Sequence, residues 1–485
     1  MAAVDGLELK VDGRTLRCAD VALVADHELT VTVAPEAAQR AADAWQLVTE
    51  LSTRREIYGR TTGVGANRDL TVDEDAGPEH GKRLLRSHAS GTGEPMPRRQ
   101  VRAMMLIRLN QMAAGGSGAH PRLLDALAAA LTSGATPPVH RTGSIGTGDL
   151  TVLAETALTL SGERPWENGS LPPVPLDTSD ALAFMSSNAA TLADAVLASR
   201  DLDRLLRASH VIAALSYVVM GGSPEAYATA VHDARPHPGQ VHCAAEMRRL
   251  LGMRGVPQPG RRIQDPYGLR AFPQVQGPAL DALDNLTRVL TVEINAATEN
   301  PMVSLVAQDV YHHAHFHTAY VAVALDQMRA TVHHVAELSA SRLGDLVEPS
   351  FTDLPAFLAS GPPGSSGVMI LEYVAHDALA TLRQAALPVT LGTAVVSRGV
   401  EDHASFATQA ARAATQAADA YRQVLACELV AAIRALRMRP ADMMDLPIRE
   451  AFDLADGVLD PTLADRPLSA DLEAATTLLD QFADF

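Results

Sequence analysis

The second half of the chain carries long stretches of helical periodicity, and these constrain its fold more than any other feature. In one of them, apolar residues recur every three or four positions and form one stripe: Val321, Leu325, Met328, Val332, Val335 and Leu338. Similar patterns cover about residues 274–297, 315–345, 366–396 and 402–438. Helices of about 30 residues are about 45 Å long. Four of them predict an antiparallel bundle, and the stripe is better explained as its core than as a cofactor site.

Proline and glycine gather at the joints between these stretches, at 254–277, 348–367 and 439–440. We therefore predict a mainly α fold in three parts along the chain. These are a mixed α/β N-terminal part, a central long-helix bundle and a set of C-terminal helices: 1–185, 186–440 and 441–485.

The N-terminal part has its own patterns. Leu7–Val11 and Leu29–Val33 alternate in polarity and predict short strands, with a turn at Asp12-Gly13. After Pro35 the pattern becomes helical, and residues 97–114 predict a helix with a wide buried face. Aromatic residues make up only 4% of a chain that is 47% hydrophobic, which favours helix packing over a β-sandwich.

The charge and the cysteines narrow the possible partners. A net charge of −17 repels phosphate backbones, so we expect no nucleic-acid partner. Cys18, Cys243 and Cys427 are far apart and lack metal or redox spacing, which indicates the reduced thiols of a cytoplasmic protein. No basic segment followed by an apolar run opens the chain, and we expect neither a signal peptide nor a membrane span.

Three short segments carry recognisable chemistry. Gly143–Leu150 is a glycine-rich turn before a helix that Asp149 could cap. Tyr58–Gly65 is a Tyr-Gly-X-X-Thr-Gly-X-Gly loop, and Gln264–Arg270 has the sequence Gln-Asp-Pro-Tyr-Gly-Leu-Arg. Each alone has an ordinary structural explanation, as a helix start, a hinge or a surface charge. Their order along one chain is what makes them informative.

Together these segments resemble the histidine and phenylalanine ammonia-lyase family, from about Tyr58 to Arg412. The resemblance implies an ammonia-lyase/fumarase-like long-helix bundle and a homotetramer whose active sites take residues from several subunits. In that family the glycine-rich segment contains Ala-Ser-Gly, which cyclises and dehydrates to an electrophilic methylidene-imidazolone group. Here the segment is one residue shorter and that serine is absent. We therefore expect a lyase without this group and without another cofactor.

A second alignment puts Gly146-Thr147-Gly148 in the place of the triad. Cyclisation would then require the Gly148 nitrogen to attack the Gly146 carbonyl, and dehydration of Thr147 would give an ethylidene. The extra methyl group hinders attack at the electrophilic carbon, so we interpret this region as degenerate. Other departures lie mostly near it: Ser186-Ser187 in place of Asn-Gly with Asn188 displaced, Glu155 in place of His, and Val400 in place of Gln.

The resemblance also assigns roles. Tyr58 matches the catalytic base of the family. A tyrosine can act as a base when a nearby cation or dipole lowers its pKa. Arg270 matches the residue that binds the substrate carboxylate, which a guanidinium can do through two hydrogen bonds. Tyr267 and Gln264 match residues of the same pocket. We expect Tyr58, Tyr267 and Glu401 to act in catalysis and Arg270 and Gln264 to bind the substrate.

His88 and Glu401 match positions that face the substrate side chain, which suggests a polar, imidazole-like side chain. Phe316 matches a pocket-lining residue, His315 stands where the family has Asn, and Ser186 completes the rebuilt wall. His312–His317 contains several histidines but no carboxylate or thiol at fixed spacing. We interpret this run as a reshaped pocket wall and expect no metal.

These residues leave three functions open. The first is β-elimination, promoted by Tyr58, on an activated amino-acid-derived carboxylate; some family members without the triad, the ergothionases, eliminate trimethylamine from an imidazole-bearing betaine in this way. The second is intramolecular addition to an α,β-unsaturated substrate, as in a biosynthetic cyclase or isomerase. The third is an inactive paralogue that binds a ligand. The retained Tyr58, Arg270 and Glu401 favour an enzyme.

Overall fold

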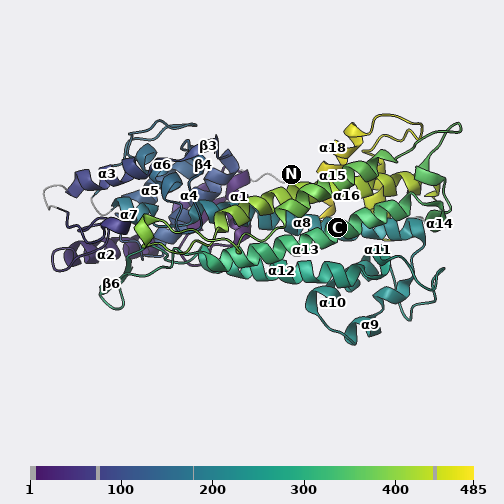
Figure 1. Cartoon of the computed structure of the whole chain (residues 1–485), viewed down its shortest axis with the longest axis horizontal. Coiled ribbons are helices and arrows are strands. Elements are labelled where there is room, and N and C mark those ends of the chain that lie inside the picture. Colours follow the sequence, from purple (N-terminus) through teal and green to yellow (C-terminus); the bar gives the residue numbers. More distant parts are fainter. Residues whose placement is uncertain (1–6, 73–76, 178–179, 441–444) are drawn as a thin grey trace. The chain divides into compact units, whose positions relative to one another are not determined.

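A computed structural model describes residues 7–72, 77–177, 180–440 and 445–485 (Figure 1). The chain forms two compact units, and each is built from three separate chain segments. Unit 1 comprises Met1–Arg200, Leu286–Leu325 and Pro388–Arg412, and unit 2 comprises Asp201–Asn285, Asp326–Leu387 and Ala413–Phe485. The predicted division of the chain at residues 185 and 440 stays a prediction.

The described residues are mainly helical, which confirms the predicted fold class. The α-helices are α1 (Cys18–Asp26), α2 (Pro35–Leu51), α3 (Gly77–His88), α4 (Arg98–Ala113), α5 (Arg122–Ser133), α6 (Leu150–Leu160), α7 (Asp180–Met185), α8 (Ala189–Met220), α9 (Thr229–Asp233), α10 (Pro238–Leu250), α11 (Tyr267–Arg270), α12 (Phe272–Glu293), α13 (Ala319–Leu346), α14 (Pro349–Thr352), α15 (Ile370–Ala385), α16 (Ala407–Met438), α17 (Arg449–Asp456) and α18 (Ser469–Phe482). The strands are β1 (Glu8–Val11), β2 (Thr30–Val33), β3 (Thr92–Pro95), β4 (His140–Thr142), β5 (Met302–Ser304) and β6 (Asp309–Tyr311).

The long helices predicted from periodicity are present as α12, α13 and α16, within a few residues of the expected bounds. The apolar stripe of α13 belongs to the core, because five of its members are buried and Leu338 is half-buried. The buried members are Val321, Leu325, Met328, Val332 and Val335. The helix expected at 366–396 is shorter, because α15 ends at Ala385 just before Pro388, a residue that cannot continue a helix.

The sequence prediction missed α8, a helix of 32 residues. Buried polar residues such as Ser209, His210 and Ser216 interrupt its apolar pattern, which hid the periodicity. Among the described residues, the stretch Asp180–Met220 is long and apolar enough to span a membrane, but its most apolar part is entirely buried inside the protein. The helices of this stretch, α7 and α8, therefore belong to the core.

The N-terminal strands are confirmed, but their connection differs from the expected pattern. Asp12 forms the predicted turn, since its carboxylate accepts the backbone N–H groups of Arg14 and Thr15. The segment between the strands was not expected to be helical, yet it contains α1. A helical crossover allows β1 and β2 to pair in parallel, with Leu9 opposite Val31. The other strands pair antiparallel, β3 with β4 and β5 with β6.

Unit 1 packs around the helix that the sequence predicted at 97–114, which is observed as α4. Its buried face includes two arginines with specific partners. Arg102 donates to the carbonyl oxygens of Val24 and Leu131, and Arg108 forms an ion pair with Glu299 at 2.7 Å. Buried charges are stable only when they are paired in this way.

Unit 2 also contains a buried ion pair. Arg342 of α13 contacts Glu428 of α16 through its Nε at 2.6 Å, and both side chains are fully buried. Ser216 and Ser339 donate their hydroxyl groups to the same carboxylate. Glu428 therefore links α8, α13 and α16 within this unit.

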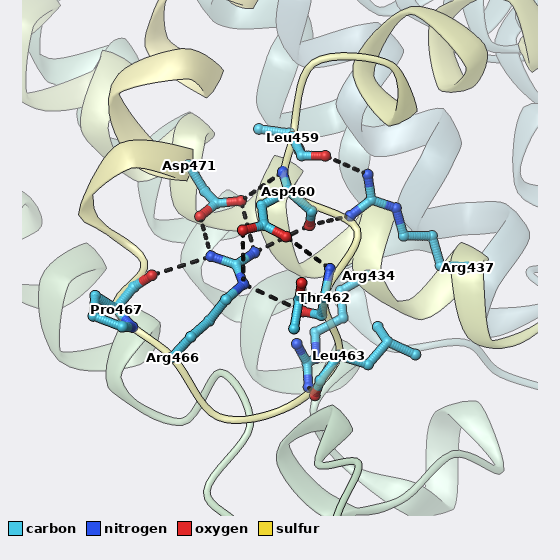
Figure 2. A network of polar contacts seen from close by, with 9 residues as sticks. All are labelled: Arg434, Arg437, Leu459, Asp460, Thr462, Leu463, Arg466, Pro467 and Asp471. Carbon is cyan, nitrogen blue, oxygen red and sulfur yellow. Dashed lines mark hydrogen bonds and ion pairs between the residues drawn. The ribbon is translucent and has the colours of Figure 1, made fainter.

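The C-terminal residues of unit 2 are attached to α16 by a second polar network (Figure 2). Arg437 donates to the carbonyl oxygens of Leu459 and Asp460, each at 2.7 Å. Arg466 forms two hydrogen bonds with Asp471 of α18. Arginine side chains thus fix a loop that has no regular secondary structure of its own.

Candidate active site

The residues predicted for the site belong to both units. Unit 1 contains the glycine-rich loop and the tyrosine loop, and with them Tyr58, His88, Gly146, Thr147, Gly148, Ser186, His315, Phe316 and Glu401. Unit 2 contains Gln264, Tyr267 and Arg270.

Tyr58 is held by its own loop. Its hydroxyl oxygen accepts the Gly65 backbone N–H at 2.6 Å, and its backbone N–H donates to Nε2 of His312 at 3.2 Å. Ala66, which follows Gly65, donates its backbone N–H to the Ser397 hydroxyl at 2.9 Å. Gly65 has a φ of 56°, a left-handed conformation that a residue with a side chain adopts only at a cost. The loop therefore places the phenol against backbone amides.

The surroundings of Tyr58 raise the pKa of its phenol, whereas a catalytic base needs a lowered pKa. Burial raises the pKa of the Tyr58 phenol above its ordinary value, and the Glu401 carboxylate raises it further. The Gly65 N–H and Arg68 oppose this shift without reversing it. The expected lowering of the pKa is thus absent within unit 1, and the phenol is protonated at neutral pH unless another positive charge approaches it.

Glu401 and His88 have different surroundings. A Cβ atom on Gly65 would lie 3.6 Å from Oε1 of Glu401, so this carboxylate lies beside the tyrosine loop. His88 ends α3, and its Nδ1 lies 2.9 Å from the carbonyl oxygen of Leu84 in the same helix. None of the hydrogen bonds described for these two side chains joins them, and their pairing remains a prediction.

The glycine-rich loop is fixed by partners from distant segments. The Gly146 carbonyl accepts hydrogen bonds from the hydroxyl groups of Thr318 and Ser405, both at 2.9 Å. The Gly148 N–H donates to Oδ1 of Asn188 at 2.9 Å. Gly146 and Gly148 have φ values of 84° and 111°, which glycine adopts most readily.

The contacts of this loop bear on whether the family's methylidene-imidazolone group can form here. The two backbone groups that ring closure would join, the Gly146 carbonyl and the Gly148 nitrogen, are both engaged in other hydrogen bonds. A Cβ atom at position 146 would lie 2.1 Å from Oγ of Ser405 and 2.7 Å from the Ala407 nitrogen. In the alignment that puts Gly146-Thr147-Gly148 in the place of the triad, the first residue therefore has no room for the side chain of Ala in the observed packing.

Asn188 has a role that the sequence did not suggest. It is displaced in the alignment, yet its side chain also donates to the Phe316 carbonyl at 2.5 Å and so joins two walls of this region. The predicted substrate-binding residue Ser186 is buried, and its hydroxyl accepts the Asn300 N–H at 2.9 Å. Ser186 therefore supports the wall through a backbone contact.

The histidine-rich run forms contacts between rings. The rings of His313 and His315 lie 4.3 Å apart, and His315 is exposed. Nε2 of His317 lies 2.9 Å from Nδ1 of His403, and burial together with the His403 ring lowers the pKa of His317. These histidines contact one another, and their role as a reshaped pocket wall stays a prediction.

Among the described residues, one group of histidine and carboxylate side chains has its possible metal-ligand atoms within 4.8 Å of one another. It lies outside the histidine-rich run and consists of His333, His334 and Glu337 of α13. The sequence did carry a signal for it, His-His-X-X-Glu at helical spacing, which our sequence analysis did not identify.

In unit 2, the Gln264–Arg270 segment has a rigid base and exposed functional groups. Asp265 is buried, and its carboxylate accepts from the Ser223 N–H and from Arg262. Arg270 donates from Nε to the Asp265 carbonyl at 2.7 Å, and its guanidinium carbon lies 4.3 Å from the centre of the Tyr267 ring. Tyr267 is 66% exposed and Gln264 is also exposed. The described hydrogen bond of Arg270 uses only Nε, the guanidinium nitrogen farthest from the tip of the side chain.

The sequence is similar to known proteins along nearly its whole length. A model of the family described as "Aromatic amino acid lyase" matches residues 16–454. A histidine ammonia-lyase from Symbiobacterium thermophilum is 34% identical over 484 residues, which cover 96% of each chain.

Solved structures match in fold. An ergothionase from Treponema denticola, an ergothioneine-degrading enzyme, has a TM-score of 0.91 at 27% identity, covering 98% of this chain and 99% of the other. A tyrosine aminomutase from Streptomyces globisporus has a TM-score of 0.90 at 26% identity, covering 98% and 97%. A matching family model over most of the chain and relatives above 30% identity lead to one conclusion: this chain belongs to the aromatic amino acid lyase family and is a carbon–nitrogen lyase of that family.

Proposed function

We propose that this protein is a lyase that works without the methylidene-imidazolone group, in which Tyr58 promotes β-elimination on a carboxylate-bearing, amino-acid-derived substrate. The glycine-rich loop is the observation that carries this proposal. Its carbonyl and amide groups are bound by Thr318, Ser405 and Asn188, and a Cβ atom at position 146 has no room. A substrate that brings its own leaving group needs no such electrophile.

The surroundings of Tyr58 favour a substrate with a fixed positive charge. The phenol has a raised pKa because it is buried beside Glu401. A quaternary ammonium group close to it would lower that pKa and favour the tyrosinate. The same group leaves as a neutral amine. One cation would therefore activate both the base and the leaving group, as on a betaine with an imidazole side chain.

The remaining roles are those that the resemblance to the family implies. Arg270 binds the carboxylate with its guanidinium, beside Tyr267 and Gln264. His88 and Glu401 face the substrate's polar side chain, while Phe316, His315 and Ser186 form the adjoining wall. The sites are completed in a cytoplasmic homotetramer by residues of several subunits.

A second candidate function is that of a histidine ammonia-lyase. It is favoured by the 34% identity to a histidine ammonia-lyase along nearly the whole chain. It requires the Gly146-Thr147-Gly148 segment to cyclise and dehydrate, which removes two water molecules from the polypeptide.

Intact-mass spectrometry separates the two functions. We expect the mass of the unmodified sequence, whereas a loss of two waters would establish the prosthetic group and refute the first function. Turnover is then measured with ergothioneine, with the trimethylammonium betaine of histidine and with L-histidine. Release of trimethylamine from a betaine supports the proposal. Ammonia released from L-histidine alone would contradict it.

The role of Tyr58 is tested with Tyr58→Phe, which keeps the ring and removes the acidic hydroxyl. We expect a loss of at least about 10³-fold in kcat on the substrate identified by the screen, with little change in thermal stability. Tyr373→Phe on the exposed face of α15 is the matched control and should keep full activity. Unchanged turnover in Tyr58→Phe would remove Tyr58 as the base.

A further inference from the structure

The group of possible metal ligands on α13 lies within unit 2 and shares no residue with the candidate active site. His333 and Glu337 are four residues apart and His334 and Glu337 are three apart, so helical geometry brings each histidine close to Glu337. The possible ligand atoms of all three side chains lie within 4.8 Å of one another. Nδ1 of His333 lies 3.6 Å from Oε2 of Glu337, and Nδ1 of His334 lies 3.3 Å from the same oxygen. Ligand atoms around a tetrahedral metal ion with bonds of about 2.0–2.1 Å are separated by about 3.4 Å.

The helix beside this group carries a further histidine, which lines the same cavity but lies outside the group of three. His376 of α15 lines a cavity of about 360 Å³ together with His333 and Glu337. The cavity is also lined by Ser341 and Arg383. A metal ion held on α13 would have one side open to this space, where His376, a water molecule or an anion could complete its coordination.

We propose that His333, His334 and Glu337 bind a divalent transition-metal ion such as Zn²⁺, with His376 as the ligand from α15. Two imidazoles and one carboxylate form a nitrogen–oxygen set that suits Zn²⁺ and the neighbouring first-row metals better than Ca²⁺ or Mg²⁺. His334 and Glu337 are more than half exposed, so the ion can reach them from solution. The bound metal clips α15 to α13.

The test is titration of the metal-stripped, full-length protein with ZnCl₂ by calorimetry. We expect one Zn²⁺ per chain with micromolar affinity and a thermal midpoint that rises with the Zn²⁺ concentration. Replacement by Co²⁺ should give the visible absorption of a tetrahedral site. The same titration with MgCl₂ should show no heat of specific binding.

Three variants locate the ion. His334→Ala and Glu337→Gln each change an exposed side chain, and each should weaken Zn²⁺ binding at least about tenfold without changing the midpoint of the metal-free protein. His376→Ala should remove most of the metal-dependent rise in the midpoint, because the link to α15 is lost. His237→Ala, which changes an exposed histidine at the start of α10, is the control and should bind Zn²⁺ normally.

Two results would overturn the proposal. One is the absence of Zn²⁺ binding to the unmodified protein. The other is binding that is unchanged in both His334→Ala and Glu337→Gln, which would assign the metal to other histidines such as those of His312–His317. Neither result bears on the proposed lyase activity, which is tested by turnover and by variants of other residues.

Discussion

The glycine-rich loop of unit 1 and the Gln264–Arg270 segment of unit 2 differ in how their polar groups are used. In the loop, the carbonyl of Gly146 and the amide of Gly148 are bound internally by side chains. In the segment, buried Asp265 supports a turn from which Tyr267 extends into solvent. One region uses its hydrogen bonds to hold itself together, and the other keeps functional groups available for a ligand. In the proposed function, the first region has lost the electrophile while the second keeps the substrate anchor.

The largest expected effect tests the anchor. Arg270→Gln keeps a polar side chain and removes the charge that binds a carboxylate, so we expect kcat/KM to fall about 10³-fold. The thermal midpoint should change little, because the described hydrogen bond of Arg270 is to one backbone carbonyl at its own turn. Arg261→Gln, which breaks the exposed ion pair with Asp353, is the control and should keep normal activity. A normal kcat/KM in Arg270→Gln would show that the carboxylate is bound elsewhere.

The second effect tests whether the loop is closely packed. Gly146→Ala would place its Cβ 2.1 Å from the Ser405 hydroxyl at a φ of 84°, and we expect about 3 kcal/mol of destabilisation. The matched control is Gly221→Ala, which has a φ of 58° but no atom within 4 Å of the added Cβ. It should cost only about 1 kcal/mol, from its backbone conformation. Equal losses in denaturant unfolding would mean that the loop has room for a side chain.

The third-largest expected effect concerns Asp194, a buried carboxylate that interacts electrostatically with Asp149 at the end of the glycine-rich loop. Burial raises the pKa of Asp194 to about 6, although Arg141 and Arg412 oppose the shift. Because the folded pKa exceeds the unfolded value, the stabilising contribution is complete below about pH 4 and is lost as the pH rises through 6. Asp194→Asn should therefore stabilise the protein by about 2 kcal/mol at pH 8, with a smaller difference at pH 5. A difference that is constant between pH 5 and 8 would exclude Asp194 as the titrating group.

The smallest effect tests a single hydrogen bond of the loop. Thr318→Val removes the hydroxyl that donates to the Gly146 carbonyl and keeps the shape of the side chain. We expect a loss of about 1 kcal/mol, because the Ser405 hydroxyl and the Thr318 backbone N–H still donate to that oxygen. Adding Ser405→Ala should cost more than the sum of the two single changes. Strict additivity would show that each hydroxyl acts independently.

Much of the bundle could be predicted from sequence because its helices have an unbroken apolar stripe, as in α13. α8 could not, since buried Ser209, His210 and Ser216 interrupt the stripe and find their partners only in the folded state. The parallel pairing of β1 and β2 was hidden for a related reason: strand patterns do not show which strands pair.

The family motifs in the sequence name the candidate site residues, but they do not reveal the residues that support them. Thr318 and Ser405 bind the Gly146 carbonyl from 172 and 259 residues away along the chain. No local pattern reports such a contact. The raised pKa of Tyr58 was hidden for the same reason, because it depends on burial in the folded chain and on Glu401, a residue far along the sequence.

The division of each unit among three chain segments has a consequence for biosynthesis. Unit 1 includes residues up to Arg412 and unit 2 includes residues up to Phe485. A ribosome making this protein must synthesise the chain at least as far as Arg412 before either unit has all its parts. The buried Arg108 of α4, for example, must wait for Glu299 before its ion pair can form, so the early part of the nascent chain stays incompletely packed until then.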